Sequence, residues 1–199
     1  MAYQYVPPVG LLDDVAIQYY SEIHDMIKPF VDYPHRDKKV ISFGTECYAY
    51  DARLAPELDI FRTGIVSSVI DPKNVARDAM VRTCPEEGSN VIIIPPHGFA
   101  LGHTVETFNI PNDVMAICIG KSTYARVGLI VNVTPINPGF RGQVVVELSN
   151  TTDYPLKVYA NEGICQFFFL RGERTPTAVY NGYYNGQTGI TLPPDLTQQ

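Results

Sequence analysis

Apolar side chains recur every three or four positions between residues 12 and 27, which is the spacing of one face of an α-helix. Asp13 and Asp14 stand at the start of this stretch, where carboxylates favour a helix N-terminus, and Pro29 follows its end. The pattern predicts one amphipathic helix that ends near Pro29 and packs against the rest of the fold. Its apolar positions are Leu12, Val15, Tyr19, Ile23, Met26 and Ile27.

From Val40 onward, short apolar runs alternate with turn residues, and the 16 prolines and 15 glycines of the chain fit frequent turns. Many short strands with few helices predict a mainly β fold, either a barrel or a sandwich. Tyr48 and Tyr50 are expected to pack in the core from alternate strand positions, and residues 167–169 to lie in a buried strand. The predicted strands cover residues 41–43, 48–54, 90–94, 99–108, 114–119, 128–134, 143–148, 156–159 and 164–170.

The chain after Leu170 changes character, because residues 180–189 are rich in glycine and asparagine. Such a segment is too poor in apolar side chains to pack a core. It is expected either to stay flexible or to become ordered over a ligand or a neighbouring subunit. The chain is therefore divided into a helix and loop at 1–38, a β domain at 39–172 and a tail at 173–199.

Composition excludes several classes of function. A net charge of −6 argues against a general nucleic-acid surface, which needs an excess of lysine and arginine. No apolar run approaches the length of about 18 residues that a membrane-spanning helix needs. The four cysteines form no Cys-x-x-Cys pair, and no signal peptide is recognisable, so we expect reduced thiols in a soluble cytoplasmic protein.

The segment 120–123 ends like a Walker A phosphate loop, Gly-Lys-Ser-Thr. That motif needs a further glycine five positions before Gly120, where this chain has Met115, and residues 116–119 read as a buried strand. The sequence therefore does not support a Walker loop. It does bring together a hydroxyl, a guanidinium and a carboxylate in the segments 120–126, 137–142 and 144–147.

These segments belong to a longer series of fragments that resembles the dCTP deaminase family of the trimeric dUTPase superfamily, from about residue 40 to residue 193. The resemblance implies a distorted, dUTPase-like β-barrel (a β-clip) and a homotrimer with active sites between subunits. It also implies hydrolytic deamination of dCTP to dUTP and ammonia, with Mg²⁺ bound through the triphosphate and no catalytic metal. The matching fragments are residues 44–53, 94–100, 120–128, 132–135, 137–142, 146–152, 160–166 and 186–193.

Attack of water on cytosine C4 needs a base for the water proton and an acid for N3 and the departing ammonia. One carboxyl group within hydrogen-bond reach can serve both steps. Glu147 follows the apolar run 144–146, so partial burial would raise its pKa towards a range useful for proton transfer. The pattern alone leaves open an outward-facing strand glutamate, but the resemblance assigns Glu147 to the catalytic glutamate. It assigns Ser122 and Arg126 to residues that orient water and substrate.

The resemblance further implies phosphate contacts from the start of the 121–126 segment, base contacts from strand backbone, and a tail that closes over the nucleotide. The implied substrate-binding residues are Lys121, Ser122, Thr123, Tyr124, Ala125, Arg126, Asn137, Val145, Val146, Tyr180, Tyr183 and Gln187.

Zinc-dependent deaminases carry a His-x-Glu and a Pro-Cys-x-x-Cys signature, and this chain has neither. His97 and His103 stand outside such a pattern, and His97 is expected to be an ordinary loop histidine. A deaminase built from this sequence is therefore expected to be free of zinc, or any other metal, at the reacting carbon.

Two departures from the family keep other functions open. Asn137 stands where the superfamily commonly has a carboxylate that activates water in dUTPases, and Tyr183 stands where relatives often carry a phosphate-binding lysine. The alternatives are a dUTP diphosphatase, a bifunctional deaminase and diphosphatase, and a non-catalytic nucleotide-binding regulator. The sequence leaves open which cytosine nucleotide is preferred and whether dTTP is an inhibitor.

Overall fold

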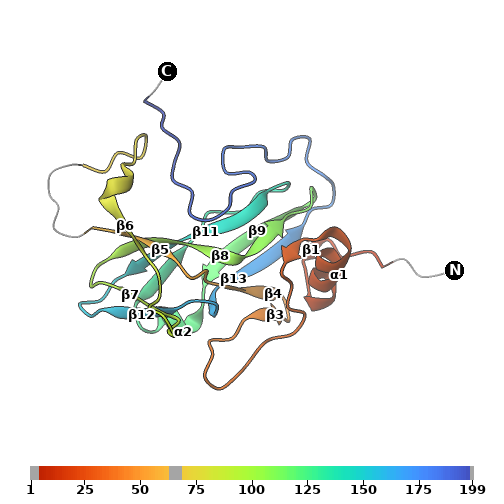
Figure 1. Cartoon of the computed structure of the whole chain (residues 1–199). Coiled ribbons are helices and arrows are strands. Elements are labelled where there is room, and N and C mark those ends of the chain that lie inside the picture. The colour runs from red at the N-terminus through yellow and green to blue at the C-terminus, as the bar shows by residue number, and fades with distance from the viewer. Residues whose placement is uncertain (1–4, 63–68, 198–199) are drawn as a thin grey trace.

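The computed structural model describes residues 5–62 and 69–197, which form mostly β-strands (Figure 1). The elements are β1 (Gly10–Leu11), α1 (Asp14–His24), β2 (Ile27–Lys28), β3 (Gly44–Glu46), β4 (Ala49–Arg53), β5 (Leu58–Phe61), the 3₁₀ turn η1 (Arg77–Ala79), β6 (Met80–Thr83), β7 (Val91–Ile94), β8 (Phe99–Asn109), β9 (Val114–Gly120), α2 (Ser122–Ala125), β10 (Leu129–Asn132), β11 (Arg141–Asn150), β12 (Leu156–Tyr159) and β13 (Gly163–Arg171).

The strands form two larger sheets and one pair. One sheet has the order β1-β13-β4-β3, with β9 on the other edge of β13. The second has the order β10-β11-β8-β5-β6, with β2 also paired to β8, and β12 pairs with β7. Within the described residues these ladders do not close into a single hydrogen-bonded ring. The prediction of a mainly β, distorted barrel-like fold is confirmed in this form.

The core lies between the two large sheets. Phe108 on β8 contacts Phe167 on β13, with ring centroids 4.5 Å apart, and both side chains are fully buried. Phe169 is buried on the same face of β13, whereas Phe168 points the other way and is partly exposed. The run 167–169 is thus a strand with two core positions, as the period of two in a strand requires.

A buried ion pair joins the sheets beside this core. Glu106 on β8 has no exposed side-chain surface and accepts hydrogen bonds from the backbone N–H of Arg53 at 2.9 Å and from its Nε at 2.7 Å. The guanidinium of Arg53 also lies over the ring of Phe43, 4.9 Å from its centroid. Each charge therefore depends on the other for compensation in the interior.

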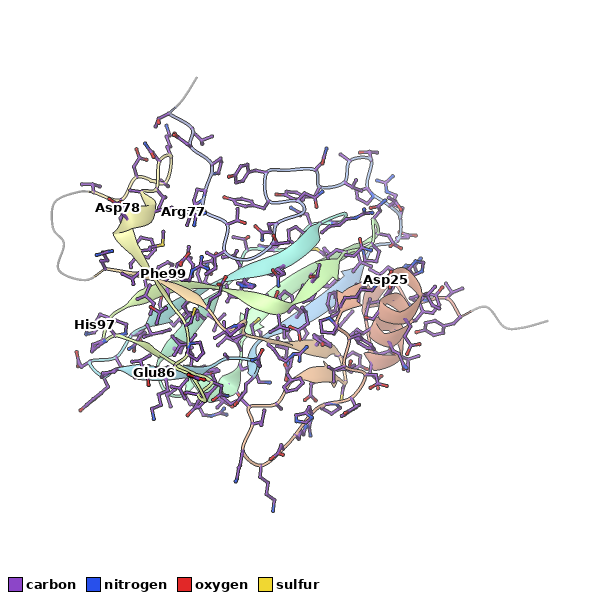
Figure 2. All side chains as sticks on the ribbon, in the orientation of Figure 1. Asp25, Arg77, Asp78, Glu86, His97 and Phe99 are labelled. Carbon is purple, nitrogen blue, oxygen red and sulfur yellow. The ribbon has the colours of Figure 1, made fainter. Side chains whose placement is uncertain are left out.

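The predicted helix is present but shorter than expected. Its N-cap Asp13 accepts a hydrogen bond from the backbone N–H of Ala16 at 2.9 Å. Asp25, labelled in Figure 2, adopts a left-handed conformation with φ 57° and ends the helix. Met26 and Ile27 were predicted inside the helix and lie beyond it, where Ile27 starts a strand that pairs with β8. Met26 and Ile27 are apolar because they are buried, and buried positions occur in strands as well as in helices, so the pattern did not show where the helix ends.

Most predicted strands are found, with ends shifted by a few residues. The run 41–43 is an exception, because the strand begins only at Gly44. Tyr50 is fully buried as expected, but Tyr48 lies in a turn and is exposed. Pattern analysis missed β5 and β6, which carry charged residues such as Asp59 and Arg82 that face each other across the ladder. Because charged side chains occupy paired positions on these strands, the alternation of apolar and polar residues that identifies a strand is absent from their sequence.

The C-terminal segment lies across β11 (Figure 1). Gly142 and Gln187 form a parallel bridge between the two. Further along, Ile190 and Leu192 are buried in a small second cluster with Met80 and Leu101. The tail thus contributes to packing, contrary to the expectation from its composition, because the apolar residues follow directly after the glycine-rich part.

Within residues 5–62 and 69–197, no helix has the length and apolar character that a membrane crossing requires.

Replacement of Glu106 by alanine tests the buried ion pair. We expect the free energy of unfolding to fall by about 3–5 kcal/mol, because the variant leaves a mostly buried guanidinium without its partner. Denaturant titration measures the change, and Glu22→Ala on the exposed face of α1 is the control, expected to change stability by less than about 0.5 kcal/mol. A loss below about 1 kcal/mol for Glu106→Ala would contradict a structural role for the pair.

Candidate active site

A cavity of about 540 Å³ lies between β11, the loop 133–140, the β5–β6 region and the C-terminal segment. Its size is in the range of small-molecule sites. Phe99, labelled in Figure 2, lines it on the side of the molecule that carries the η1 turn of Arg77 and Asp78. The walls are mainly apolar, and the polar groups among them are few, including Asn137, Glu147 and Gln187.

The pleat of β11 decides which of its side chains reach this cavity. Val146 and Leu148 are buried away from the cavity, whereas the partly buried Val145 and Glu147 line it; the buried Val144 also borders the cavity. The side chain of Val146 faces the core, and the predicted contact of its backbone with substrate stays a prediction. The alternation therefore presents a carboxylate and an apolar side chain two positions apart on the same face.

Glu147 is the only carboxylate among the described residues that line the cavity. It lies opposite Leu101 on β8 and Asn132 on β10, and its Oε2 accepts a hydrogen bond from Asn132 Nδ2 at 3.3 Å. Burial raises the pKa of Glu147 above its usual value, while hydrogen bonds from its own backbone and from Asn132 oppose the rise. The expected direction of the pKa shift is confirmed.

Asn137 reaches the cavity from the loop that follows β10. Ile136 fixes this loop by a two-way backbone bridge with Ala116 on β9, and the backbone N–H of Phe140 donates to the carbonyl of Asn137 at 3.2 Å. The side-chain amide of Asn137 can donate and accept hydrogen bonds, but it cannot take up a proton from water at neutral pH.

The tail supplies one wall of the cavity. Tyr180, Tyr184 and Gln187 line it, and the backbone N–H of Tyr184 donates to the hydroxyl of Tyr180 at 3.3 Å. Tyr183 is 61% exposed, contacts the ring of Tyr184 and is not among the lining residues.

Sequence reasoning missed Tyr184 and the apolar wall formed by Phe61, Phe99 and Leu101. The wall comes from segments distant along the chain, so no local signal could identify it. Tyr184, by contrast, stands next to the predicted Tyr183 and could have been found from the doublet.

Ser122 and Arg126 lie elsewhere in the same chain. The short helix α2 precedes Leu129, which pairs with Asn150, whereas Glu147 pairs with Asn132 at the other end of the β10–β11 ladder. Ser122, Thr123, Ala125 and Arg126 are exposed and do not line the cavity. A guanidinium nitrogen of Arg126 donates to the carbonyl of Ser122 at 3.0 Å. One chain therefore does not bring Ser122 and Arg126 to Glu147.

The flanking residues hold α2 in place. The ammonium group of Lys121 forms an ion pair with the buried Asp51 and donates to Ser42 Oγ at 3.2 Å. The buried Tyr124 accepts a hydrogen bond at its hydroxyl from the backbone N–H of Tyr159, at 3.1 Å. The predicted phosphate contact of Lys121 stays a prediction, because in this structure both of its donors have partners: the ammonium group pairs with Asp51, and the backbone N–H donates to the carbonyl of Ile164 at 3.3 Å.

The residues around the cavity can also be tested for metal binding. Within the part of the chain that the structure describes, no three His, Cys, Asp or Glu side chains gather in a way that could hold a metal ion. His97 is an exposed loop residue whose Nε2 lies 2.8 Å from Asp153, and His103 is buried and lies 3.2 Å from Glu57. Neither histidine lines the cavity.

Comparison with known proteins gives a consistent result. The sequence model of a family described as dCTP deaminase-like matches residues 20–172. A protein named dCTP deaminase from Erythrobacter litoralis is 50% identical over 188 residues, which cover 93% of this chain and 99% of that protein. Another of the same name from Acidiphilium cryptum is 54% identical over 171 residues, covering 84% of this chain and 90% of that protein. The resemblance seen in the sequence is confirmed.

A solved structure supports the fold independently. The crystal structure of 2'-deoxycytidine 5'-triphosphate deaminase from Agrobacterium tumefaciens matches with a TM-score of 0.61 at 18% identity, covering 82% of this chain. The match covers 48% of that chain, so this chain spans about half the length of the solved protein. At this level of identity the likeness concerns the fold.

Replacement of Asn132 by leucine tests the environment of Glu147. Leucine has a similar size but no donor, so the charged carboxylate loses a hydrogen bond and the pKa of Glu147 is expected to rise further. NMR detection of the side-chain carboxyl during a pH titration measures the pKa, and the signal is assigned by its absence in Glu147→Gln. An unchanged or lower pKa in Asn132→Leu would show that the amide does not stabilise the carboxylate.

Proposed function

This chain belongs to the dCTP deaminase-like family, and we propose that it hydrolyses dCTP to dUTP and ammonia. The observation that carries the proposal is the partly buried Glu147 in an apolar cavity, with a pKa raised by burial. A carboxyl group whose pKa is raised above its usual value is a stronger base than an ordinary glutamate, as general acid–base catalysis by one group requires.

Glu147 would act as both base and acid in this reaction. As the oxygen of water forms a bond to C4 of cytosine, the carboxylate takes the water proton, and N3 of the ring is protonated. The carboxyl group delivers the first proton to N3, then takes the remaining proton from the new hydroxyl on C4 and passes it to the exocyclic amino group. The C4–N4 bond then breaks, ammonia leaves and C4 becomes the carbonyl carbon of uracil. The apolar walls formed by Phe99, Leu101 and Val145 favour this role, because they exclude bulk water from the carboxyl group.

Ser122 and Arg126 would complete the site from a neighbouring subunit. The helix α2 that carries them lies between β9 and β10 in the sequence, and both strands carry exposed apolar side chains. Ile117 and Ile119 on β9 are 40% and 47% exposed, and Ile130 on β10 is 56% exposed. Exposed apolar residues that gather beside α2 favour burial against another copy of the chain. We therefore propose a homotrimer in which Glu147 and α2 of different subunits meet.

The triphosphate would lie towards α2, where Thr123 and Arg126 are exposed and free to face it. Among the described residues that line the cavity, Glu147 is the only carboxylate that could bind a metal ion. Mg²⁺ would therefore be held by the phosphate oxygens of the nucleotide and would neutralise part of their charge. Tyr183 is exposed on the tail and offers a hydroxyl or a ring face where a lysine would offer a charge, which predicts weaker phosphate capture than in lysine-bearing relatives.

Asn137 weighs against the rival diphosphatase activity, because an amide in the cavity cannot activate water for attack on the α-phosphate. Chromatography of the products from a panel of cytosine and uracil nucleotides, with and without Mg²⁺, separates the candidates. Deamination releases ammonia and leaves the triphosphate intact, a diphosphatase releases pyrophosphate, and a bifunctional enzyme gives both. A regulator that only binds nucleotide gives neither product.

Replacement of Glu147 by glutamine tests its role as acid and base. We expect turnover of dCTP to fall by about 10²–10⁴-fold, because the amide cannot transfer protons, while nucleotide binding and assembly are retained. Steady-state and single-turnover assays measure the loss. Glu86→Gln is the matched control, since Glu86 lies in an exposed turn (Figure 2) and is expected to leave the rate unchanged. Stoichiometric zinc in active protein, with activity lost on its removal, would falsify the proposed metal-free chemistry.

Subunit mixing tests whether the site is shared. Neither Glu147→Gln nor Arg126→Ala protein is expected to be active alone. In trimers reassembled from an equal mixture, about one quarter of the sites would combine an intact Glu147 with an intact Arg126 from the next subunit, and activity would recover accordingly. Light scattering on the same samples reports assembly relative to the 22.1 kDa monomer. An inactive mixture of well-formed trimers would mean that the two residues act within one chain.

A further inference from the structure

The strand β11 contains an irregularity just before the residues that line the cavity. Its register against β8 shifts between Gln143 and Val145, so the ladder between these strands is interrupted there. The gap is filled by side chains: Thr104 Oγ1 accepts from the backbone N–H of Val144 at 3.0 Å, and Nε2 of Gln143 donates to the carbonyl of Thr104 at 3.1 Å. The amide of Gln143 is thereby fixed in one orientation on β8.

The same residue holds the C-terminal segment by its remaining polar groups. Its Oε1 accepts a hydrogen bond from the backbone N–H of Gly189 at 2.7 Å. Its backbone N–H donates to the carbonyl of Gln187 at 3.0 Å, and its carbonyl accepts from Gln187 Nε2 at 2.7 Å. Gln143 thus makes three hydrogen bonds to two tail residues while its own amide nitrogen is anchored to β8.

The neighbouring residue permits this close approach. Gly142 has φ 133°, and a Cβ placed there would lie 2.5 Å from the carbonyl oxygen of Gln187. Such a contact is too short for any side chain, so the tail can pass at this distance only over a glycine. The preceding residue adds a further link, because the backbone N–H of Arg141 donates to Asn185 Oδ1 at 2.8 Å.

We propose that Gln143 is a positioning residue that holds the C-terminal segment against β11 and so builds the tail wall of the nucleotide site. Gln143 does not line the cavity, but Tyr184 and Gln187 of the docked tail do. The expected effect on catalysis rests on the proposed function, whereas the docking of the tail by Gln143 does not depend on it. A chain whose tail is docked only part of the time binds nucleotide with an affinity reduced by that fraction, and bound nucleotide restores docking. Loss of the Gln143 amide therefore raises KM and leaves kcat nearly unchanged.

Two variants of Gln143 and one control test this role. Gln143→Leu keeps the length but removes donor and acceptor, and Gln143→Glu retains an oxygen that can accept from Gly189. Gln18→Leu makes the same chemical change on the exposed face of α1. Backbone amide hydrogen exchange followed by NMR reports docking at Gly189 and global opening at Phe167 on β13. Kinetics with dCTP report KM and kcat.

Gln143→Leu is expected to accelerate exchange at Gly189 by about tenfold or more while Phe167 stays protected, since a lost hydrogen bond opens only the tail. KM for dCTP is expected to rise as the reciprocal of the docked fraction of the tail, which is about tenfold for a tail docked about a tenth of the time, with kcat changed by less than about threefold. Gln143→Glu is expected to recover only part of the protection at Gly189, because its carboxylate can accept from Gly189 but has no donor for the carbonyls of Thr104 and Val105. Gln18→Leu is expected to behave like the original chain in both measurements.

Unchanged exchange at Gly189 in Gln143→Leu would overturn the proposal, and so would acceleration that extends equally to Phe167, because that would show general destabilisation. A tail that exchange shows to be mostly undocked, together with unchanged KM, would overturn the link to nucleotide capture. The hydrogen-exchange measurement does not depend on catalytic activity. A chain that fails to deaminate dCTP would refute the proposed function, and the exchange rates of the variants would still decide whether Gln143 docks the tail.

Discussion

The register of β11 is the constraint on which the candidate site depends. This strand pairs with β10 on one side and β8 on the other, and its alternate residues fill the core between the sheets. A shift by one position would bury Glu147 and expose Val146, which costs the burial of several apolar side chains as well as the desolvation of a charge. The same register sets Asn132 beside Glu147. Core packing therefore fixes the position of the carboxylate and, through burial, its raised pKa.

The chain divides its functional groups between two regions that lie at opposite ends of one ladder. The carboxylate, Asn137 and the tail residues surround the cavity, whereas α2 presents Ser122 and Arg126 near the start of β10. Buried neighbours fix α2 through Lys121 and Tyr124, so its exposed side chains are held on a rigid base. The proposed site between subunits would account for both observations, because it would bring the exposed side chains of α2 to the cavity of another copy.

The sequence predicted those features that local patterns encode. Alternating apolar runs gave most of the strands, and the position of Glu147 after the run 144–146 correctly predicted its partial burial. The charged ladder formed by Asp59 and Arg82 escaped detection, since ion pairing across the strands leaves no apolar period. The apolar wall and the contacts of Gln143 with the tail also escaped, because they join residues that are distant along the chain. The roles of Ser122 and Arg126 came from the family resemblance alone, since no local pattern distinguishes them from ordinary surface residues, and they stay predictions.

The most direct test of this account is the fate of the water oxygen. With dCTP as substrate in H₂¹⁸O, mass spectrometry of the products locates the new oxygen. Attack on C4 predicts dUTP that carries one ¹⁸O on the uracil base, an intact triphosphate, and one ammonia released for each labelled base. Label on the α-phosphate together with pyrophosphate, or labelled base formed only after zinc is supplied, would contradict the account in which Glu147 directs water to the cytosine ring.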